Sequence, residues 1–366
     1  MYFIRVLKDK QEVIVMKFYP ELMEFADGRK VETAADWQER KKELVKLLAE
    51  NEYGFSPEAP EKVEVEIEAN KRECQCSGHA DLEKITLSFD TPNGKFSFPF
   101  NFFVPHKKSP LILLINFRSA PYDKYCPSEE VIDNGFALAS FNYKDVTSDD
   151  NDFTNGLAAM YPRDEKTGWG KISMWAWAAS RVLDYLVTRP EIDTDNIAVA
   201  GHSRLGKTTL WCAAQDERVK YALVNGSGCA GAAYERIKHG DSETTEAIFR
   251  VFPYWFCGNY GQYANKADEM PIDQHFAIAA CAPRYVFVGD AEQDEWADQY
   301  SSQLSCVAAT PAWKLLGKDG FIGPEERAVC GDRFADGQIG YHLRDGRHYI
   351  GRADWNSYMQ FIKSKM

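Results

Sequence analysis

A serine lies in a glycine-containing turn between a predicted strand and a predicted helix. Residues 197–212 read IAVAGHSRLGKTTLWC, so an apolar segment leads directly into Gly201 and Ser203. A sharp strand-to-helix turn of this kind exposes a nucleophilic hydroxyl, and the start of the helix supplies amides and a positive dipole end for an oxyanion. The segment therefore predicts a nucleophile elbow with Ser203 as nucleophile, although the pattern G-x-S-x-G expects glycine where Leu205 stands.

The same residues also fit a second motif. Gly201, Gly206, Lys207 and Thr208 satisfy G-x-x-x-x-G-K-[ST], the phosphate-binding loop of nucleotide-binding proteins. Residues 285–290 (YVFVGD) add an apolar strand that ends in an aspartate, which would suit a magnesium ion. The local pattern does not decide between a serine hydrolase and a nucleotide-binding protein, so the rest of the chain has to.

A serine hydrolase also needs a base and an acid, which follow the serine in the order Asp or Glu, then His, in a fold of this type. Of the seven histidines, His348 lies in a loop rich in Gly and Arg and is the predicted base. His342 follows a short apolar stretch and is interpreted as structural. Several carboxylates follow the apolar segment 285–288, and chain order does not choose among them: Asp290, Glu292, Asp294, Glu295 and Asp298.

Apolar strands that alternate with helices would hold these groups. Continuous apolar runs indicate strands buried on both faces, so we expect a largely parallel sheet with helices on both sides. The polar stretch 144–168 is too long for a simple connection and is predicted to be an insertion near the active-site face. Strands are predicted at residues 111–117, 136–141, 197–200, 221–224 and 285–288, and helices at 172–186 and 207–215.

The region before this alternation has a different pattern. Residues 63–104 alternate apolar and polar side chains and contain Asn93-Gly94, a strong hairpin signal, so they predict antiparallel strands. Residues 36–51 predict an amphipathic helix with Asp36 as its N-cap. We expect an N-terminal extension, residues 1–60, packed on a catalytic domain, residues 61–366, the two forming effectively a single domain.

Composition and charge exclude several classes of protein. The 366 residues are 45% apolar and 13% aromatic, which is enough for a large core. A net charge of −12 disfavours nucleic-acid binding. No apolar run approaches the about 20 residues of a membrane span, so no membrane partner is expected.

The cysteines and the N-terminus bear on the compartment. Nine cysteines, without CxxC or HExxH spacing, predict buried free thiols rather than a disulfide framework or a zinc site. Residues 1–16 lack the features of a signal peptide. We therefore expect a cytoplasmic protein if the chain is complete, and a secreted or periplasmic one if a leader has been removed.

Six segments follow one another between residues 201 and 348: GHSRLGKTTLWCAAQDERV, NGSGCAGAA, FPYWFC, MPIDQHFAIAACAPR, AEQDEWAD and IGYHLRDGRH. Together they resemble the bacterial glucuronoyl esterases of carbohydrate esterase family 15. The likeness that they carry extends from the helix near Asp36 to the C-terminus. The resemblance implies an α/β-hydrolase fold, a three-layer sandwich with a mostly parallel central sheet and an antiparallel N-terminal hairpin region. It also implies a serine esterase that cleaves esters of glucuronic or 4-O-methylglucuronic acid on xylan and requires no metal or organic cofactor.

The resemblance assigns roles to individual residues by position. Ser203 becomes the nucleophile and His348 the base, and Arg204 donates to the oxyanion. Lys207 hydrogen-bonds the sugar hydroxyls and Trp296 lines the sugar site. Glu243 is a weaker candidate for a sugar contact, and we interpret it as a surface charge.

Two positions depart from the family pattern. Some members, chiefly fungal, carry the acid as Glu before a Ser-Gly pair, but here Gly226 precedes Ser227-Gly228. The acid is therefore assigned to Asp294, which follows the next predicted strand. Tyr349 stands where related sequences often carry Asp, and no consequence follows from the sequence.

The expected partner is a glucuronate ester of a xylo-oligosaccharide or of glucuronoxylan, and the protein is expected to be a monomer. Three other hypotheses stay open. One is an acetyl xylan esterase or general carboxylesterase of the same fold, and another is a nucleotide-binding protein that uses Lys207 and Thr208. The third is a carbohydrate-binding relative with weak catalysis.

Overall fold

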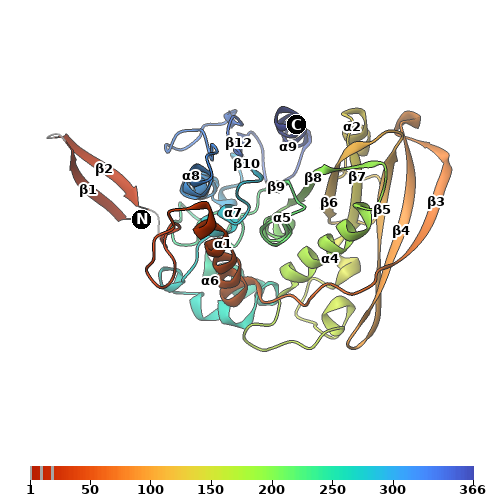
Figure 1. Ribbon diagram of the computed structural model, residues 1–366, viewed down its shortest axis with the longest axis horizontal. Helices are drawn as coiled ribbons and strands as arrows, with labels where there is room; N and C mark the ends of the chain where they lie inside the picture. The colour runs from red at the N-terminus through yellow and green to blue at the C-terminus, as the bar shows by residue number, and fades with distance from the viewer. Residues whose placement is uncertain (1, 9–10, 18–19) are drawn as a thin grey trace.

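A ten-stranded sheet forms the framework of the computed structural model, which describes residues 2–8, 11–17 and 20–366 (Figure 1). The strand order is β11-β12-β10-β9-β8-β6-β7-β5-β4-β3. Neighbours from β12 to β7 pair in parallel, whereas β11 and the strands β5, β4 and β3 pair antiparallel at the two edges. The strands are β3 (Glu64–Gln75), β4 (Ala80–Thr91), β5 (Gly94–Pro105), β6 (Ser109–Asn116), β7 (Ala137–Asn142), β8 (Ile192–His202), β9 (Tyr221–Asn225), β10 (Tyr285–Ala291), β11 (Arg333–Phe334) and β12 (Ile339–Arg344). The predicted mostly parallel sheet with an antiparallel N-terminal region is therefore confirmed.

Helices cover both faces of this sheet and complete the three layers. They are α1 (Ala34–Leu48), α2 (Ser128–Asp133), α3 (Tyr143–Val146), α4 (Lys171–Leu186), α5 (Arg204–Gln215), α6 (Thr245–Val251), α7 (His275–Ala279), α8 (Gln299–Leu315) and α9 (Arg352–Lys365). Strand β6 shows why both faces are apolar. Leu111, Leu113 and Ile115 belong to the core that includes α1, α4, α5, α7 and α8, while Ile112 and Leu114 belong to the core under α2 and α9 (Figure 1).

Helix α1 begins earlier than the sequence predicts. Thr33 is its N-cap, because the Thr33 hydroxyl accepts a hydrogen bond from the Asp36 amide at 3.1 Å and the Asp36 carboxylate accepts one from the Thr33 amide at 2.8 Å. The predicted N-cap, Asp36, is therefore wrong: Asp36 is the third helical residue and closes a capping box. A π-helical turn, Ala49–Tyr53, continues the helix to Gly54. The division into an extension and a catalytic domain stays a prediction.

Two further boundaries differ from the sequence analysis. Thr91 pairs with Gly94, so the β4–β5 turn consists of Pro92 and Asn93 rather than Asn93-Gly94. Asn93 instead donates its side-chain amide to Ala159 in the insertion at 2.8 Å. Helix α5 begins at Arg204 rather than at Lys207, so the nucleophile candidate directly precedes the first turn of the helix.

The N-terminal residues form a separate pair of antiparallel strands, β1 (Tyr2–Lys8) and β2 (Gln11–Lys17). Side chains of residues 1–19 and 69–75 lie outside the described part, and the prediction that residues 1–16 are not a signal peptide falls on such residues. Among the described residues, the helices are too short or too polar to cross a bilayer. Among the described cysteines, the free thiols are buried except that of Cys330, as the sequence predicts for most of them.

Candidate active site

The turn between β8 and α5 holds Ser203 in a strained conformation. Its φ of +59° and ψ of −128° lie outside the regions that residues other than glycine favour, which is typical of a serine that a tight turn presents. Glycines are required on either side. A Cβ at Gly201 would lie 2.2 Å from the Leu205 carbonyl oxygen, and one at Gly206 would lie 2.8 Å from the Asn225 carbonyl oxygen. The main chain after the serine approaches β9 most closely at position 206. The second glycine is therefore needed there, and position 205 can hold leucine.

Three side chains from distant segments meet at this turn. His348 Nε2 lies 2.8 Å from Ser203 Oγ, and His348 Nδ1 lies 2.6 Å from Asp294 Oδ2. Asp294 follows the carboxyl end of β10 and is buried, while His348 lies in the loop between β12 and α9. The carboxylate accepts from Nδ1–H, so Nε2 is left as the acceptor for the serine proton. This geometry is that of a nucleophile, a base and an orienting acid.

The other four carboxylates after β10 are placed elsewhere. Asp290 is fully buried near Ser302 and Tyr341, and burial raises its pKa well above the usual range. Glu292 and Glu295 are exposed. Asp298 caps α8 and accepts a hydrogen bond from the His239 amide. Of the five predicted candidates, Asp294 is the carboxylate that the fold brings to His348.

Gly226, at the position where some relatives carry the acid, borders the same space. Its φ is +48°, and a Cβ there would lie 3.3 Å from His202 Cε1 and 3.5 Å from Asp294 Oδ2. A glutamate side chain at 226 would extend into the volume that Asp294 occupies. The departure from the family pattern therefore has a structural counterpart: the acid comes from the segment after β10, and the positive φ at position 226 favours glycine.

Two neighbours hold the base in place. The His202 ring lies 4.4 Å from the His348 ring, and His202 Nδ1 lies 2.7 Å from Asn225 Oδ1. Burial lowers the pKa of His202 to about 3, so this ring is neutral and does not repel a protonated His348. Tyr349, for which the sequence suggested no consequence, donates its hydroxyl to the Lys124 carbonyl at 2.7 Å and so ties the base loop to the loop after β6.

Arg204, the first residue of α5, supplies the donors beside the serine. The first amides of a helix have no intrahelical acceptor, so its N–H is available to an oxyanion. Its guanidinium forms an ion pair with Asp149 and lies 4.8 Å from the Trp255 ring centre. The side chain is 25% exposed, so Arg204 is enclosed at the site rather than directed outward as a surface ion pair.

The residues predicted to contact the sugar also lie together, but Lys207 and Glu243 make contacts that the sequence did not predict. The Lys207 ammonium donates to the carbonyls of Ser227 and Cys229 and lies 3.1 Å from Glu243 Oε2. An ammonium has three donors, so protein acceptors use all of them and direct bonds to sugar hydroxyls would displace one. Glu243 is buried, so its interpretation as a surface charge is wrong: it is the counter-ion of buried Lys207.

Trp296 lies beside this pair. Its indole N–H donates to Glu243 Oε1 at 3.2 Å, and the side chain is largely exposed, as expected of a residue that lines a binding site. The phosphate-loop hypothesis fails at the same place. The Lys207 donors are occupied, Thr208 donates to the Arg204 carbonyl, and the Glu243 carboxylate neutralises the Lys207 charge that a phosphate would need.

A cavity of about 190 Å³ opens onto these groups. It is lined by Ser203, Arg204, Lys207, Gly226, Ser227, Gly228, Glu243, Phe252, Trp255, Trp296, Ala297 and His348. A larger hollow of about 870 Å³ between Phe55, Tyr161 and Trp169 contains none of the catalytic candidates. The chemistry therefore belongs to the smaller cavity, whose size suits a single sugar unit better than a drug-sized ligand.

Known proteins are similar to this chain both in sequence and in architecture. The family model described as glucuronyl esterase, fungi, matches residues 87–317. The chain belongs to the glucuronoyl esterase family. A glucuronoyl esterase from Solibacter usitatus has 29% identity and a TM-score of 0.87, with 96% of this chain and 98% of that one covered.

Two further relatives agree. A promiscuous CE15 esterase from the marine bacterial metagenome has 30% identity and a TM-score of 0.84, again with 96% and 98% covered. The 4-O-methyl-glucuronoyl methylesterase of Schizophyllum commune is 26% identical over 81% of this chain and 73% of its own length. This family member is thus a carboxylic ester hydrolase of carbohydrate esterase family 15, as the sequence resemblance indicated, with an α/β-hydrolase fold.

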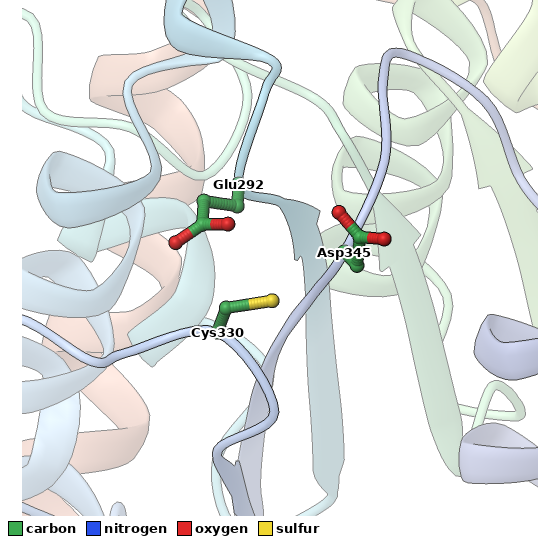
Figure 2. Close-up of side chains that lie close together, drawn as sticks. All are labelled: Glu292, Cys330 and Asp345. Atoms are coloured by element: carbon green, nitrogen blue, oxygen red, sulfur yellow. The ribbon is translucent and has the colours of Figure 1, made fainter.

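One group of metal-ligating side chains lies outside the cavity of this glucuronoyl esterase. Glu292, Cys330 and Asp345 come from three separate segments and face one another (Figure 2), with ligand atoms within 4.8 Å of one another. All three are exposed. Desolvation and the neighbouring Glu292 carboxylate raise the pKa of the Cys330 thiol, whereas a metal binds the thiolate. Exposed carboxylates beside a protonated thiol do not amount to a metal site.

Two residues at the site, Asp149 and His202, were not among the predicted site residues. Asp149 lies in the polar insertion among several other acidic residues, and nothing in that stretch distinguishes it. The carboxylate nevertheless reaches Arg204, which confirms that the insertion lies near the active site. His202 directly precedes Ser203, and a histidine at the end of an otherwise apolar strand could have indicated that it belongs to the site.

Proposed function

We propose that this glucuronoyl esterase cleaves the ester that joins C6 of a glucuronic or 4-O-methylglucuronic acid unit to an alcohol, on xylan or a xylo-oligosaccharide. The observation that carries the proposal is the pairing of the Ser203–His348–Asp294 relay with a charged arginine in one cavity. The name of the Schizophyllum commune relative supports the 4-O-methyl-glucuronoyl group as the acyl half.

The reaction follows from the positions of the donors and acceptors. His348 Nε2 takes the Ser203 proton while Oγ attacks the ester carbonyl, and the carbonyl π-electrons move onto oxygen as the new C–O bond forms. Arg204 and its amide stabilise that oxyanion, because charged donors in a shielded site are stronger than neutral ones. The tetrahedral intermediate then expels the alcohol oxygen, which receives the proton from His348, and a glucuronoyl-serine remains.

Water completes the cycle by the same relay. His348 takes a proton from water, hydroxide adds to the acyl carbon, and Ser203 leaves with the proton returned from His348. The ester substrate is neutral, whereas the released uronate is an anion, which the chain's net charge of −12 disfavours. This difference favours departure of the product over retention.

An esterase that removes acetyl groups is the alternative of the same fold. An acetyl group offers no ring or hydroxyl to the exposed Trp296 face, whereas the acyl half of a uronate ester is itself a sugar ring. We therefore favour the uronate ester. The relative described as promiscuous leads us to expect slow turnover of simple esters as well.

The test compares benzyl esters of glucuronic and 4-O-methylglucuronic acid with 4-nitrophenyl acetate. We expect kcat/KM to be at least about a hundredfold higher for the uronate esters and to be lost in Ser203→Ala, whose residual rate falls by roughly 10⁴-fold or more. A preference for acetate would replace the proposal by a general or acetyl esterase. Wild-type-like turnover by Ser203→Ala, with melting unchanged, would remove Ser203 from its role.

A further inference from the structure

The Asp149 carboxylate is surrounded by donors from separate parts of the chain. Trp255 Nε1 donates to Oδ1 at 2.8 Å, the Tyr143 hydroxyl donates to Oδ2 at 2.8 Å, and Arg204 Nη1 pairs with the same Oδ2. The Tyr254 hydroxyl also donates to the Asp149 main-chain carbonyl at 3.1 Å. The Asp149 side chain is only 6% exposed. Several bonds therefore have to break before this carboxylate can move.

The loop that carries Asp149 is itself anchored. The Lys171 ammonium, at the start of α4, is fully buried and donates to Ser148 Oγ at 2.9 Å and to the Asp152 carbonyl at 2.7 Å. Ser148 and Asp152 flank Asp149 in the sequence. The main chain on both sides of Asp149 is therefore held by a cation in the core, which makes the insertion a rigid part of the site.

The Arg204 guanidinium is enclosed between Asp149 and two aromatic rings. Phe252 and Trp255 stack on each other at 3.9 Å and 1°, and the guanidinium lies 5.4 and 4.8 Å from their ring centres. Its Nε is buried and has no hydrogen-bond partner among the described residues. Arg204 thus gives one donor atom to Asp149 and keeps others, in a cavity that it lines together with Ser203.

An oxyanion site gains most when its donors are fixed before the reaction begins. A free arginine side chain carries about 2 kcal/mol of rotamer entropy, which would be lost each time it closed on the oxyanion. The Asp149 carboxylate has the opposite effect of reducing the positive potential at the oxyanion. Its charge is, however, shared among three donors, so we expect the orienting effect to be the larger one.

We propose that Asp149 is a positioning residue for the oxyanion site: its carboxylate, held by Tyr143 and Trp255, fixes the Arg204 guanidinium beside Ser203. Asp149 acts through Arg204 and touches no reacting atom. The inference rests on the esterase function proposed above. It predicts a defect in the chemical step, not in substrate binding.

A double-mutant cycle on benzyl glucuronate tests this directly. For Asp149→Asn, which keeps the acceptor for Trp255 but not the charge for Arg204, we expect kcat to fall about tenfold to a hundredfold, with KM changed by less than about threefold. For Arg204→Met we expect a fall of about 10²–10³-fold. In the Arg204→Met background, Asp149→Asn should cost no more than about twofold further, because the residue through which it acts is gone.

Control variants separate positioning from a general loss of structure. Glu165→Gln changes an exposed carboxylate of the same insertion that is not bonded to Arg204, Ser148 or Lys171, and should leave kcat within about twofold. Tyr143→Phe removes one of the three bonds to the Asp149 carboxylate and should give an intermediate loss of kcat, which keeps the test open if Asp149→Asn does not fold.

Three outcomes would overturn the proposal. They are an unchanged or increased kcat in Asp149→Asn, an equal loss in both Arg204 backgrounds, and an equal loss in Glu165→Gln. Failure of the proposed function would look different, because the wild-type protein itself would not cleave the uronate ester.

Discussion

At the scale of single residues, the contacts of His348 determine what it can do. Nδ1 faces the Asp294 carboxylate and Nε2 faces the serine hydroxyl, so the ring has one orientation and one useful tautomer. The carboxylate orients the base and stabilises the imidazolium that forms after proton transfer. Removal of its charge without a change of shape should therefore slow the chemistry and leave binding intact.

For Asp294→Asn we expect kcat on benzyl glucuronate to fall by about 10³–10⁴-fold, because a neutral amide does not stabilise the imidazolium and its NH2 group can hold the wrong imidazole tautomer. The matched control is Glu295→Gln, an exposed carboxylate next in the sequence, which should retain turnover within about twofold. Initial rates over a substrate series give kcat and KM separately. A large loss in Glu295→Gln and none in Asp294→Asn would show that Asp294 is not the acid.

At the scale of elements, two loops on the sugar side are fastened to each other. The Asp298 carboxylate, at the start of α8, accepts from the His239 amide, from His239 Nδ1 at 2.9 Å and from the Ser242 hydroxyl at 3.0 Å. The Glu243 amide donates to the Trp296 carbonyl at 2.9 Å. The loop after β9, which carries Glu243, is thereby joined to the loop after β10, which carries Trp296.

Weakening that junction should affect binding of the sugar more than the chemistry. For His239→Phe, which retains an aromatic ring at this position but loses the side-chain bond to Asp298 and keeps the main-chain one, we expect KM for benzyl glucuronate to rise about threefold to tenfold. Turnover of 4-nitrophenyl acetate, which does not use Glu243, is the internal control and should stay within about twofold. Equal losses on both substrates would show that the junction supports the relay instead.

At the scale of the whole molecule, buried carboxyl groups join the N-terminal helix to the core. Gln274, at the start of α7, donates to the Glu52 carboxylate at 2.9 Å and to Glu235 at 3.2 Å, and the Tyr260 hydroxyl donates to Glu235 at 3.1 Å. Burial raises the pKa of Glu235 to about 7, and burial also raises the pKa of Glu52. Both groups therefore favour their neutral forms in the folded protein.

The sign of the resulting pH dependence follows from linkage. A carboxyl with a raised folded-state pKa stabilises the fold fully below its unfolded pKa of about 4.3, and the contribution is lost as the pH rises through 7. Glu235 should therefore contribute more to the stability of the folded protein at pH 5 than at pH 8.

Thermal melting of wild type and Glu235→Gln between pH 5 and pH 8 tests this expectation. The neutral amide does not titrate, so the Tm difference should move in favour of the variant by roughly 5 °C from pH 5 to pH 8. Exposed Glu61→Gln is the control, and its curve should follow that of the wild type. A Tm difference that is independent of pH would mean that Glu235 does not titrate in this range.

Much of the fold followed from the sequence because local patterns report local structure. Continuous apolar runs gave the parallel strands β6 to β10, and Lys171–Leu186 formed the helix that the periodicity predicts. Asp36 was misassigned because a capping box needs two partners, and the sequence analysis recognised only one of them. The strand β12 and the helices α8 and α9 were not predicted. In α8, polar residues at buried positions hide the periodicity.

For the site, the sequence predicted Ser203 as nucleophile and His348 as base and indicated the family, because the turn at Ser203 and the loop at His348 are short contiguous motifs. The structure brings the two side chains within hydrogen-bond distance. The choice of Asp294 among five carboxylates agrees with the fold, which supplies its reason: only this side chain ends within reach of Nδ1. The burial of Glu243 against Lys207 and the contact of Asp149 with Arg204 were decided by the tertiary structure alone. Ion pairs between distant segments leave no local pattern, since a buried charge and a solvated charge have the same letter in a sequence.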